Sequence, residues 1–232
     1  MRRLLILAAC VAFGSGAFAK EAPNFDWAGT YLGLQGGYGW ADTSWSFPFD
    51  EYYNTAPGQG FATSPTGGLG GAFVGINRQY GDWVAGLEAS ISGSSLSETL
   101  TGPVTPTYAF DQLTTRLDDL ETVTGRLGFA KQNWLFYGRG GFGTGDANLS
   151  ALSGPPGAGV TANVTKRLYG WTLGSGIEFM ATDSVVVGVE YDYTSLSGAR
   201  FAGVNSNSGS FNVDLGNVAT STVLGRVSLR LH

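Results

Sequence analysis

Hydrophobic and polar residues alternate along much of this chain with a period of two, the pattern of a β-strand whose two faces meet different surroundings. Over residues 31–40 one face carries leucine, tyrosine and tryptophan, and the other carries mainly glycine. Three segments alternate this clearly, and five follow the rule less closely, with Phe73 as one interruption. They are 31–40, 83–92 and 184–193, followed by 70–80, 122–130, 134–144, 167–179 and 221–232. The pattern therefore predicts eight β-strands.

The connections between these strands alternate in length. Short turns are predicted at 81–82, 131–133 and 181–183, and long connections over about 42–66, 93–116, 146–165 and 195–217. Outer-membrane barrels alternate short periplasmic turns with long extracellular loops, and their strands need roughly nine to eleven residues to cross the membrane. An even strand number places both termini on the periplasmic side. Because the long connections keep some alternation, we also expect the strands to extend beyond the membrane.

Alternation alone does not show which face points to lipid, because a soluble lipocalin-like barrel of eight strands also alternates. Three features favour the membrane. The polar faces carry glycine, threonine and serine with few lysines, unlike a solvated surface. Glycines gather on that polar face, where a narrow lumen has little room. Aromatic residues near strand ends are typical of the membrane–water interface; they are Trp40, Trp83, Trp134, Trp171, Tyr191 and Tyr193. We predict an all-β fold, an eight-stranded antiparallel transmembrane up-and-down β-barrel.

Composition agrees with this fold. Only 13% of the 232 residues are charged, against about 25% in soluble domains. No run of about 18 apolar residues follows the N-terminus, so the sequence predicts no membrane helix.

The N-terminus has the pattern of a cleavable secretory signal peptide. Arg2 and Arg3 precede an apolar stretch over 4–13. The small residues of a cleavage site follow, and they are Ala17 and Ala19, with Lys20 as the first residue of the mature chain. The predicted division is therefore 1–19 signal peptide and 20–232 outer-membrane barrel. A membrane anchor is the alternative, but the apolar stretch is too short for one.

Cys10 is the only cysteine. A lipoprotein box at 7–10 is a second alternative for this region, but the apolar stretch before Cys10 would be too short for a signal peptide. Cleavage would leave no cysteine, which excludes disulfides and thiolate chemistry in the mature chain. It would also leave 11 basic against 18 acidic side chains, a net charge near −7. That balance predicts no nucleic-acid binding.

Short motifs in the strands resemble the small outer-membrane protein family of alphaproteobacteria, the outer-membrane immunogenic or porin-family proteins. The matching stretches are 27–33 with 37–39, 75–79, 125–129, 134–138, 170–174 and 189–193. The resemblance implies an eight-stranded barrel related in architecture to the OmpA transmembrane domain. It implies roles in envelope integrity and in host or surface contact. The implied partners are outer-membrane lipid, the barrel insertion machinery during assembly, and a host or surface ligand at the extracellular loops.

This chain departs from the family pattern in its last residues. Such barrels usually end in an aromatic residue that the insertion machinery recognises, whereas this chain ends in Leu231 and His232. Val227, Leu229 and Leu231 still alternate, so the last strand is expected, and the departure bears only on efficient assembly.

The odd or even position of each residue in the strand alternation places eight charged residues in the lumen, four acids and four bases. They are Glu88, Glu178, Glu190, Asp192, Arg126, Arg139, Arg226 and Arg230. An eight-stranded lumen is just wide enough for its side chains, and an unpaired buried charge costs several kcal/mol. We therefore predict Glu–Arg pairs that cross-link the wall and plug the lumen. Arg230 and Asp192 are expected at wet barrel ends, where pairs contribute little. The alternative is a gate whose pairs exchange partners to admit ions.

No catalytic constellation is recognisable in the sequence. The glycines of 138–143 fit G-x-G-x-x-G by letter, but no helix is predicted behind them. The single histidine is His232, and serine without a base is not an activated nucleophile. No cysteine and histidine cluster suggests a metal. We predict no enzyme and no cofactor.

The long connections carry aromatic side chains that either bind a partner surface or pack on the barrel rim. They are Trp45, Phe47, Phe49, Tyr52, Tyr53, Tyr108 and Phe110. The sequence thus favours a structural and surface-interaction protein of the outer membrane. A narrow porin-like channel for ions or small solutes is the alternative.

Overall fold

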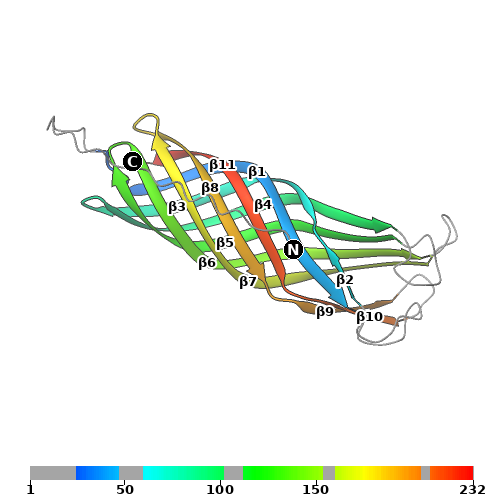
Figure 1. The fold of residues 1–232 in the computed structure, drawn as a ribbon. Coiled ribbons are helices and arrows are strands. Elements are labelled where there is room, and N and C mark those ends of the chain that lie inside the picture. Colours follow the sequence, from blue (N-terminus) through cyan, green and yellow to red (C-terminus); the bar gives the residue numbers. More distant parts are fainter. Residues whose placement is uncertain (1–24, 47–59, 102–111, 154–159, 205–209, 232) are drawn as a thin grey trace, which may run out of the picture.

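The computed structural model describes residues 25–46, 60–101, 112–153, 160–204 and 210–231, and they form a barrel of tilted antiparallel strands (Figure 1). The barrel strands are β1 (Gly29–Ser46), β3 (Thr66–Tyr80), β4 (Trp83–Thr101), β5 (Gln112–Lys131), β6 (Trp134–Ser153), β7 (Val160–Met180), β8 (Val185–Leu196) and β11 (Val218–Leu231). Three short strands accompany them, namely β2 (Gly60–Thr63), β9 (Ala199–Val204) and β10 (Ser210–Leu215). The predicted eight-stranded antiparallel barrel is confirmed. No helix long and apolar enough to span a membrane occurs among the residues that the structure describes.

The eight strands pair in chain order, and β11 closes the ring against β1. A hydrogen-bonded row that starts at Thr30 passes once around the barrel and returns to β1 at Trp40, ten residues further along. Closing a sheet with such an offset requires strands tilted by roughly 35–45° to the barrel axis. The offset therefore decides which inward side chains meet across the lumen.

Short turns join β3 to β4, β5 to β6 and β7 to β8 at one end of the barrel, which we call the turn end. In the first turn Gly81 has a φ of 61°, a left-handed conformation that glycine adopts without strain. Thr30 pairs with Leu231, so β1 begins and β11 ends at the turn end as well. We call the opposite end the loop end.

The strands are longer than the sequence pattern predicted, and this corrects the boundaries of the long connections. β5 has 20 residues and β7 has 21, so both reach well into segments expected to be loops. A β9–β10 hairpin pairs with the end of β1, and β2 pairs with the same end of β1. The expected strand extensions are therefore present at the loop end.

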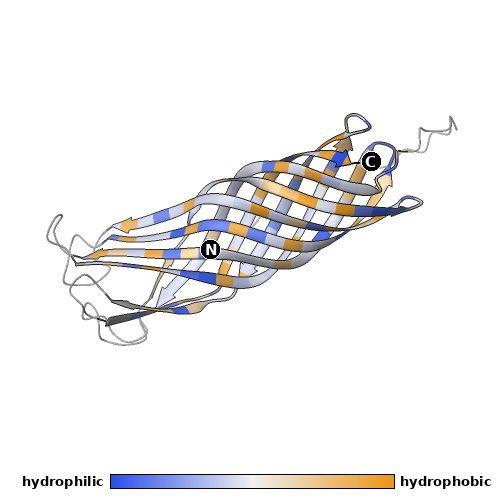
Figure 2. Cartoon of the chain, turned by 180° about the vertical axis from the view of Figure 1, so that it is seen from behind, coloured by the Kyte–Doolittle hydropathy of each residue, from blue (hydrophilic) through white to orange (hydrophobic). Residues whose placement is uncertain are grey.

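Alternation continues into these extensions, but its polarity inverts. On β1, Leu32 and Leu34 point outward and are exposed, while Gln35 is buried in the lumen. Beyond Trp40 the buried inward side chain is Trp45, and Asp42 points outward. Figure 2 shows hydrophobic and hydrophilic positions alternating along the strands. The part of the wall nearer the turn end, which we call the lower part, is thus apolar outside. The loop-end extension, which we call the upper part, is apolar inside.

Register shifts contribute to the missed boundaries. The pairing of β4 with β5 shifts between Gly93 and Leu96, and that of β5 with β6 shifts between Leu117 and Glu121. On the turn-end side of the shift in β5 the buried residues are even-numbered, as at Thr122. On its loop-end side they are odd-numbered, as at Leu117. Such bulges change which parity faces inward, so a single alternation rule cannot follow the whole strand.

Buried side chains fill the barrel interior in three layers. An apolar turn-end core comprises Trp27, Val84, Ala130, Leu135, Tyr137, Met180 and Val186. A larger apolar loop-end core includes Trp45, Leu96, Leu149, Leu168, Leu196, Phe201 and Val218. Between the two lies a layer of charged and polar side chains, which is the candidate site.

Candidate functional site

Seven charged residues form the middle layer, which we call the ionic layer. They are Glu88 on β4, Arg126 on β5, Arg139 on β6, Glu178 on β7, Glu190 and Asp192 on β8, and Arg226 on β11. Alternation on each strand turns these side chains inward, and none is more than 6% exposed. Charges this deeply buried need partners, because an unpaired buried charge destabilises the folded state by several kcal/mol.

Glu88 joins all three arginines of the layer. Its carboxylate lies 2.6 Å from Nη2 of Arg226, 3.0 Å from Nη1 of Arg139 and 3.4 Å from Nη1 of Arg126. These arginines come from β11, β6 and β5, so one carboxylate on β4 links three other strands. This is a network across the lumen rather than a set of separate pairs.

Glu190 and Glu178 complete the network on the far side. Arg139 donates to Glu190 from Nη1 at 2.5 Å, and Arg226 donates to the other oxygen of the same carboxylate. Arg126 donates to Glu178 from Nη2 at 2.7 Å. Each guanidinium therefore bridges carboxylates from two different strands.

Aromatic side chains support this network. Tyr31 donates its hydroxyl to Glu88 at 2.9 Å, and Tyr137 donates to Glu190 at 2.6 Å. The guanidinium of Arg126 lies 3.9 Å from the centre of the Tyr137 ring. Phe73, which interrupts the alternation, points into the lumen. The guanidinium of Arg226 lies 3.8 Å from the centre of its ring. Such cation–π contacts strengthen when water is excluded.

Glycines on the inner face leave the room that these long side chains need. A Cβ at Gly188 would come within 2.8 Å of Cγ of Glu178, and one at Gly174 within 3.0 Å of Cγ of Asp192. This agrees with the prediction that glycines lie on the lumen face because the lumen is narrow.

The ionic layer has one negative charge in excess by formal count, because four carboxylates face three guanidiniums. Asp192 has the weakest pairing. Its Oδ1 atom lies 3.6 Å from Nε of Arg139 and has no hydrogen-bond partner among the described residues. The sequence placed Asp192 at a wet barrel end, and the structure corrects this, since the residue is buried in the layer. The alternation of residues showed that Asp192 faces inward, but it did not show how far from the barrel end the residue lies.

Arg230 lies at the turn end, outside the ionic layer. It donates to the backbone oxygens of Asp183 and Ala28, each at 3.0 Å, and it has no ion pair within the part of the chain that the structure describes. The position near an end is the one the sequence indicated. The segment around Ala28 precedes β1, so Arg230 fastens that segment to the barrel wall.

The aromatic residues predicted to form an interfacial girdle all point outward. Five of them are between 41% and 56% exposed, and Tyr193 is half-buried. Trp83 and Trp134 begin β4 and β6 at the turn end and pack on Phe129 and Phe179, with ring centres 5.7 and 4.8 Å apart. The cleavage-site residues Ala17, Ala19 and Lys20, and also His232, lie outside the described residues.

Sequence analysis missed aromatic residues of the interior, among them Trp27, Trp45 and Phe201. Trp27 precedes β1, and its side chain is buried in the turn-end core. Trp45, a candidate for partner binding, is 1% exposed and donates through Nε1 to Thr115. The other aromatic candidates of the long connections, from Phe47 to Phe110, lie outside the described residues. The alternation that continues around Trp45 is a signal that could have shown its inward position.

The chemistry available to the ionic layer is charge pairing. Every carboxylate faces guanidinium or hydroxyl donors from other strands. No group of three or more histidine, cysteine or acidic side chains suited to a metal ion occurs among the described residues. Apolar cores lie on both sides of the layer, so the arrangement suits a brace and a seal.

Comparison with known proteins gives a family match and several relatives. The family model of the outer membrane protein beta-barrel domain matches residues 5–217. The 31 kDa outer-membrane immunogenic protein of Brucella melitensis is 27% identical over 196 residues, which cover 83% of this chain and 81% of that protein. The 22 kDa outer membrane protein of Rhizobium leguminosarum bv. viciae is 29% identical over 197 residues, covering 83% and 75% of the two chains.

Solved structures share the barrel fold at low sequence identity. The outer membrane protease OmpT from Escherichia coli superposes with a TM-score of 0.53 at 10% identity, covering 90% of this chain and 99% of its own. The outer membrane protein OprG from Pseudomonas aeruginosa gives a TM-score of 0.50 at 14% identity, covering 88% and 97%. These likenesses support the fold alone.

Proposed function

We propose that this chain, which belongs to the outer membrane protein beta-barrel domain family, is a closed structural barrel whose ionic layer braces the wall and seals the lumen. The family and its relatives are proteins of the outer membrane, and that membrane is where this chain belongs. The alternative retained from the sequence is a narrow channel for ions or small solutes.

The burial of the ionic layer between two apolar cores carries this proposal. No residue of the layer is more than 6% exposed. An ion that crossed the lumen would also have to pass Leu135 and Met180 at the turn end and Leu168 and Leu196 at the loop end, all of which are buried. An apolar constriction opposes ion passage because the ion would lose its hydration there.

The same contacts support the bracing role. Arg126, Arg139 and Arg226 each bridge carboxylates from two strands, so separating the strands that they join would expose several buried charges at once. Removing one partner of a buried ion pair typically costs about 3–5 kcal/mol. A gate that exchanges partners would have to cross comparable barriers.

We further propose that the turn end faces the periplasm and that the loop end faces outside. The short turns, the start of β1 and the end of β11 all gather at the turn end. Short periplasmic turns and longer outer connections are usual in outer-membrane barrels. On this basis the loop end is where contact with a host or surface ligand would occur. The Brucella melitensis relative is named an immunogenic protein, and the protease OmpT shares only the fold, so the proposal includes no catalytic activity.

Single-channel conductance in planar bilayers tests the seal. Refolded protein is first shown to be inserted, by heat-modifiable gel mobility and by protease protection of the transmembrane part. We expect no discrete current steps from protein that passes both checks. Steady open steps from the unmodified chain would refute the seal and favour the channel alternative. A Leu135→Gly and Leu168→Gly double variant is a control, because thinning both apolar cores should increase any leak.

A further inference from the structure

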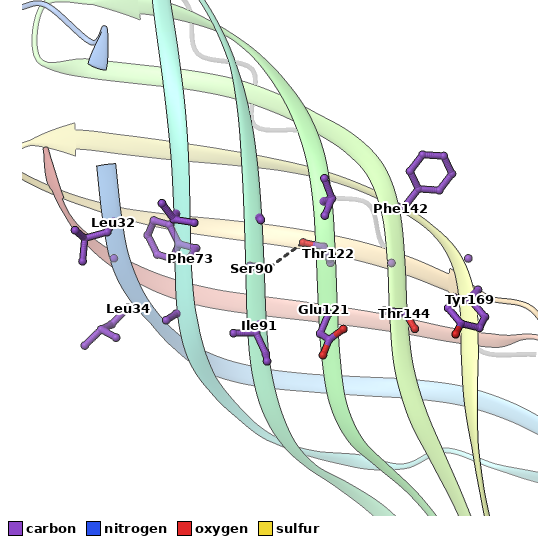
Figure 3. A pocket seen from close by; sticks show the side chains of 17 residues that line it. Leu32, Leu34, Phe73, Ser90, Ile91, Glu121, Thr122, Phe142, Thr144 and Tyr169 are labelled. Atoms are coloured by element: carbon purple, nitrogen blue, oxygen red, sulfur yellow. Dashed lines mark hydrogen bonds between the residues drawn. The ribbon is translucent and has the colours of Figure 1, made fainter. Parts of the chain in front are cut away.

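A shallow apolar groove crosses the outward wall of the barrel, and we call it the outer groove (Figure 3). It has a volume of about 660 Å³, within the range of about 300–1,000 Å³ for ligand sites. Its outward lining includes Leu32, Leu34, Ala72, Ile91, Phe142 and Tyr169. The small side chains of Ala72 and Ala89 leave the recess between the larger ones.

The outer groove follows the hydrogen-bonded rows of the sheet. One row runs from Leu34 on β1 to Tyr169 on β7, and the residues between them are Ala72, Ile91, Glu121 and Thr144. Six strands at about 4.8 Å spacing give a path of roughly 24 Å along the wall. Because rows advance ten residues per circuit, this path rises from the turn-end side at β1 towards the loop end at β7. The groove is therefore a diagonal track.

A charged cluster lies where the outer groove reaches the loop end. Glu121 and Thr144 line the groove, and both contact Arg167, which pairs with Glu121 and donates through Nε to Thr144 at 3.2 Å. Nη1 of Arg167 also lies 3.4 Å from Asp119 and 3.5 Å from Asp146. We call Asp119, Glu121, Asp146 and Arg167 the rim cluster. One guanidinium faces three carboxylates there, which leaves two negative charges in excess.

The rim cluster marks the edge of the apolar band. On β5 the outward residues between Glu121 and Lys131 are uncharged, from Val123 to Phe129. Ten residues of tilted strand are about the span of the hydrocarbon layer. The side chains of the cluster are between 25% and 36% exposed, and at this level we expect lipid head groups around them.

We propose that the outer groove binds a membrane lipid whose head group carries an amine. One acyl chain lies along the groove, and the ammonium group meets the rim cluster. The excess negative charge attracts an ammonium, which offers three hydrogen-bond donors, and it repels the phosphate of a purely anionic lipid. An acyl chain gains little hydrophobic energy by leaving bulk lipid, so selection comes mainly from the head group.

Native mass spectrometry of the full protein measures this selection. The protein is reconstituted in nanodiscs with equal amounts of phosphatidylethanolamine and phosphatidylglycerol of identical acyl chains, and retained lipids are counted after ejection. We expect phosphatidylethanolamine to be favoured about two- to five-fold, the range that one exposed ion pair confers. The double variant Glu121→Gln and Asp146→Asn should abolish this preference. Ala72→Phe, which fills the recess, should reduce retention of both lipids.

Matched controls separate the site from general effects. Asp42→Asn removes an outward carboxylate at the loop-end part of β1, outside the rim cluster, and should leave the preference unchanged. Val223→Phe enlarges an outward residue of β11 outside the groove and should leave retention unchanged. Heat-modifiable gel mobility shows that each variant is folded.

Equal retention of the two lipids by the unmodified protein would overturn the proposal. So would a preference that survives the double variant. Retention of phosphatidylglycerol that disappears with a chelator would replace it by a phosphate bridged through a divalent cation. The inference does not depend on the sealed lumen, because lipid retention and conductance are measured separately.

Discussion

The lower and upper parts of the same barrel strands are built with opposite polarity. In the lower part the wall is apolar outside and encloses the ionic layer. In the upper part the outward residues are polar, as at Asp42 and Arg116, and the interior is the apolar loop-end core. Strands β1, β5, β6 and β7 each run through both parts. The comparison shows that the surroundings of the wall, rather than the strand itself, determine which face of a strand is apolar.

The two interiors are therefore stabilised by different means. The loop-end core excludes water from apolar side chains, as a soluble domain does. The ionic layer relies on satisfied charges, and its stability depends on the balance between carboxylates and guanidiniums. The two parts should respond differently to the same kind of substitution.

Removing an arginine from the ionic layer should give the largest effect. Arg139→Met keeps most of the side-chain volume but leaves four buried carboxylates facing two guanidiniums. We expect a loss of about 3–5 kcal/mol in the free energy of unfolding, measured by urea denaturation in lipid vesicles with tryptophan fluorescence. Arg230→Met is the matched control and should cost much less. Similar losses for the two variants would contradict the distinction between the layer and the turn end.

Truncating a leucine should give the next largest effect, and its cost in stability should differ between the lower and upper parts. Leu168 is buried in the loop-end core, and Leu168→Ala should cost about 2–4 kcal/mol, as in a soluble core. Leu127 points outward in the lower part, and Leu127→Ala should cost less than about 1 kcal/mol because lipid fills the space. The same unfolding assay compares them. Equal costs would show that the apolar side does not invert along the strands.

Neutralising the excess charge should have a smaller effect. Asp192→Asn balances the layer at three carboxylates and three guanidiniums, so we expect the unfolding free energy to change by less than about 1 kcal/mol. Glu190→Gln removes a carboxylate that pairs with both Arg139 and Arg226 and should cost several times more. If Asp192→Asn proved as damaging as Glu190→Gln, the identification of Asp192 as the weakly paired residue would be wrong.

The exposed pair of the β9–β10 hairpin should give the smallest effect. Arg200 donates to both carboxylate oxygens of Asp214, at 2.7 and 2.9 Å, and this hydrogen bonding lowers the pKa of Asp214 below its usual 3.8. A lowered pKa favours the folded state above pH 3.8, and the contribution is lost as the pH falls through the folded value. Carbon NMR titration of Asp214 should show the lowered pKa, and Arg200→Gln should restore the usual one. An unchanged titration in Arg200→Gln would exclude the pair as its cause.

Much of the fold was predictable from alternation. The eight strands, the short turns and the inward parity of Glu88, Arg139 and Arg226 followed from residue spacing alone. Strand lengths did not, because polarity inverts near Trp40 and the register shifts between Leu117 and Glu121. A prediction that assumes one apolar face along the whole strand therefore ends the strand too early, at the inversion or at the register shift.

The partners within the candidate site were less accessible to sequence analysis. Parity shows that Glu88 and Arg226 face inward, but their contact depends on the ten-residue offset of the closed sheet. Neighbours across the lumen are fixed by tilt and closure, which no local pattern encodes. For the same reason the depth of Asp192 was misjudged. Trp45 was missed because the apolar face turns inward beyond Trp40, and Trp27 was missed because it precedes the first alternating segment.

The ten-residue offset also has a mechanical consequence. Each hydrogen-bonded row winds around the axis like the thread of a screw, because after one circuit it meets its own strand at a different height. Tension that draws the loop end away from the turn end is therefore partly converted into torsion, and the rows share the load as shear between neighbouring strands. Hydrogen bonds loaded together in shear resist better than bonds opened one at a time. A pull between the two ends would therefore twist the barrel as well as lengthen it.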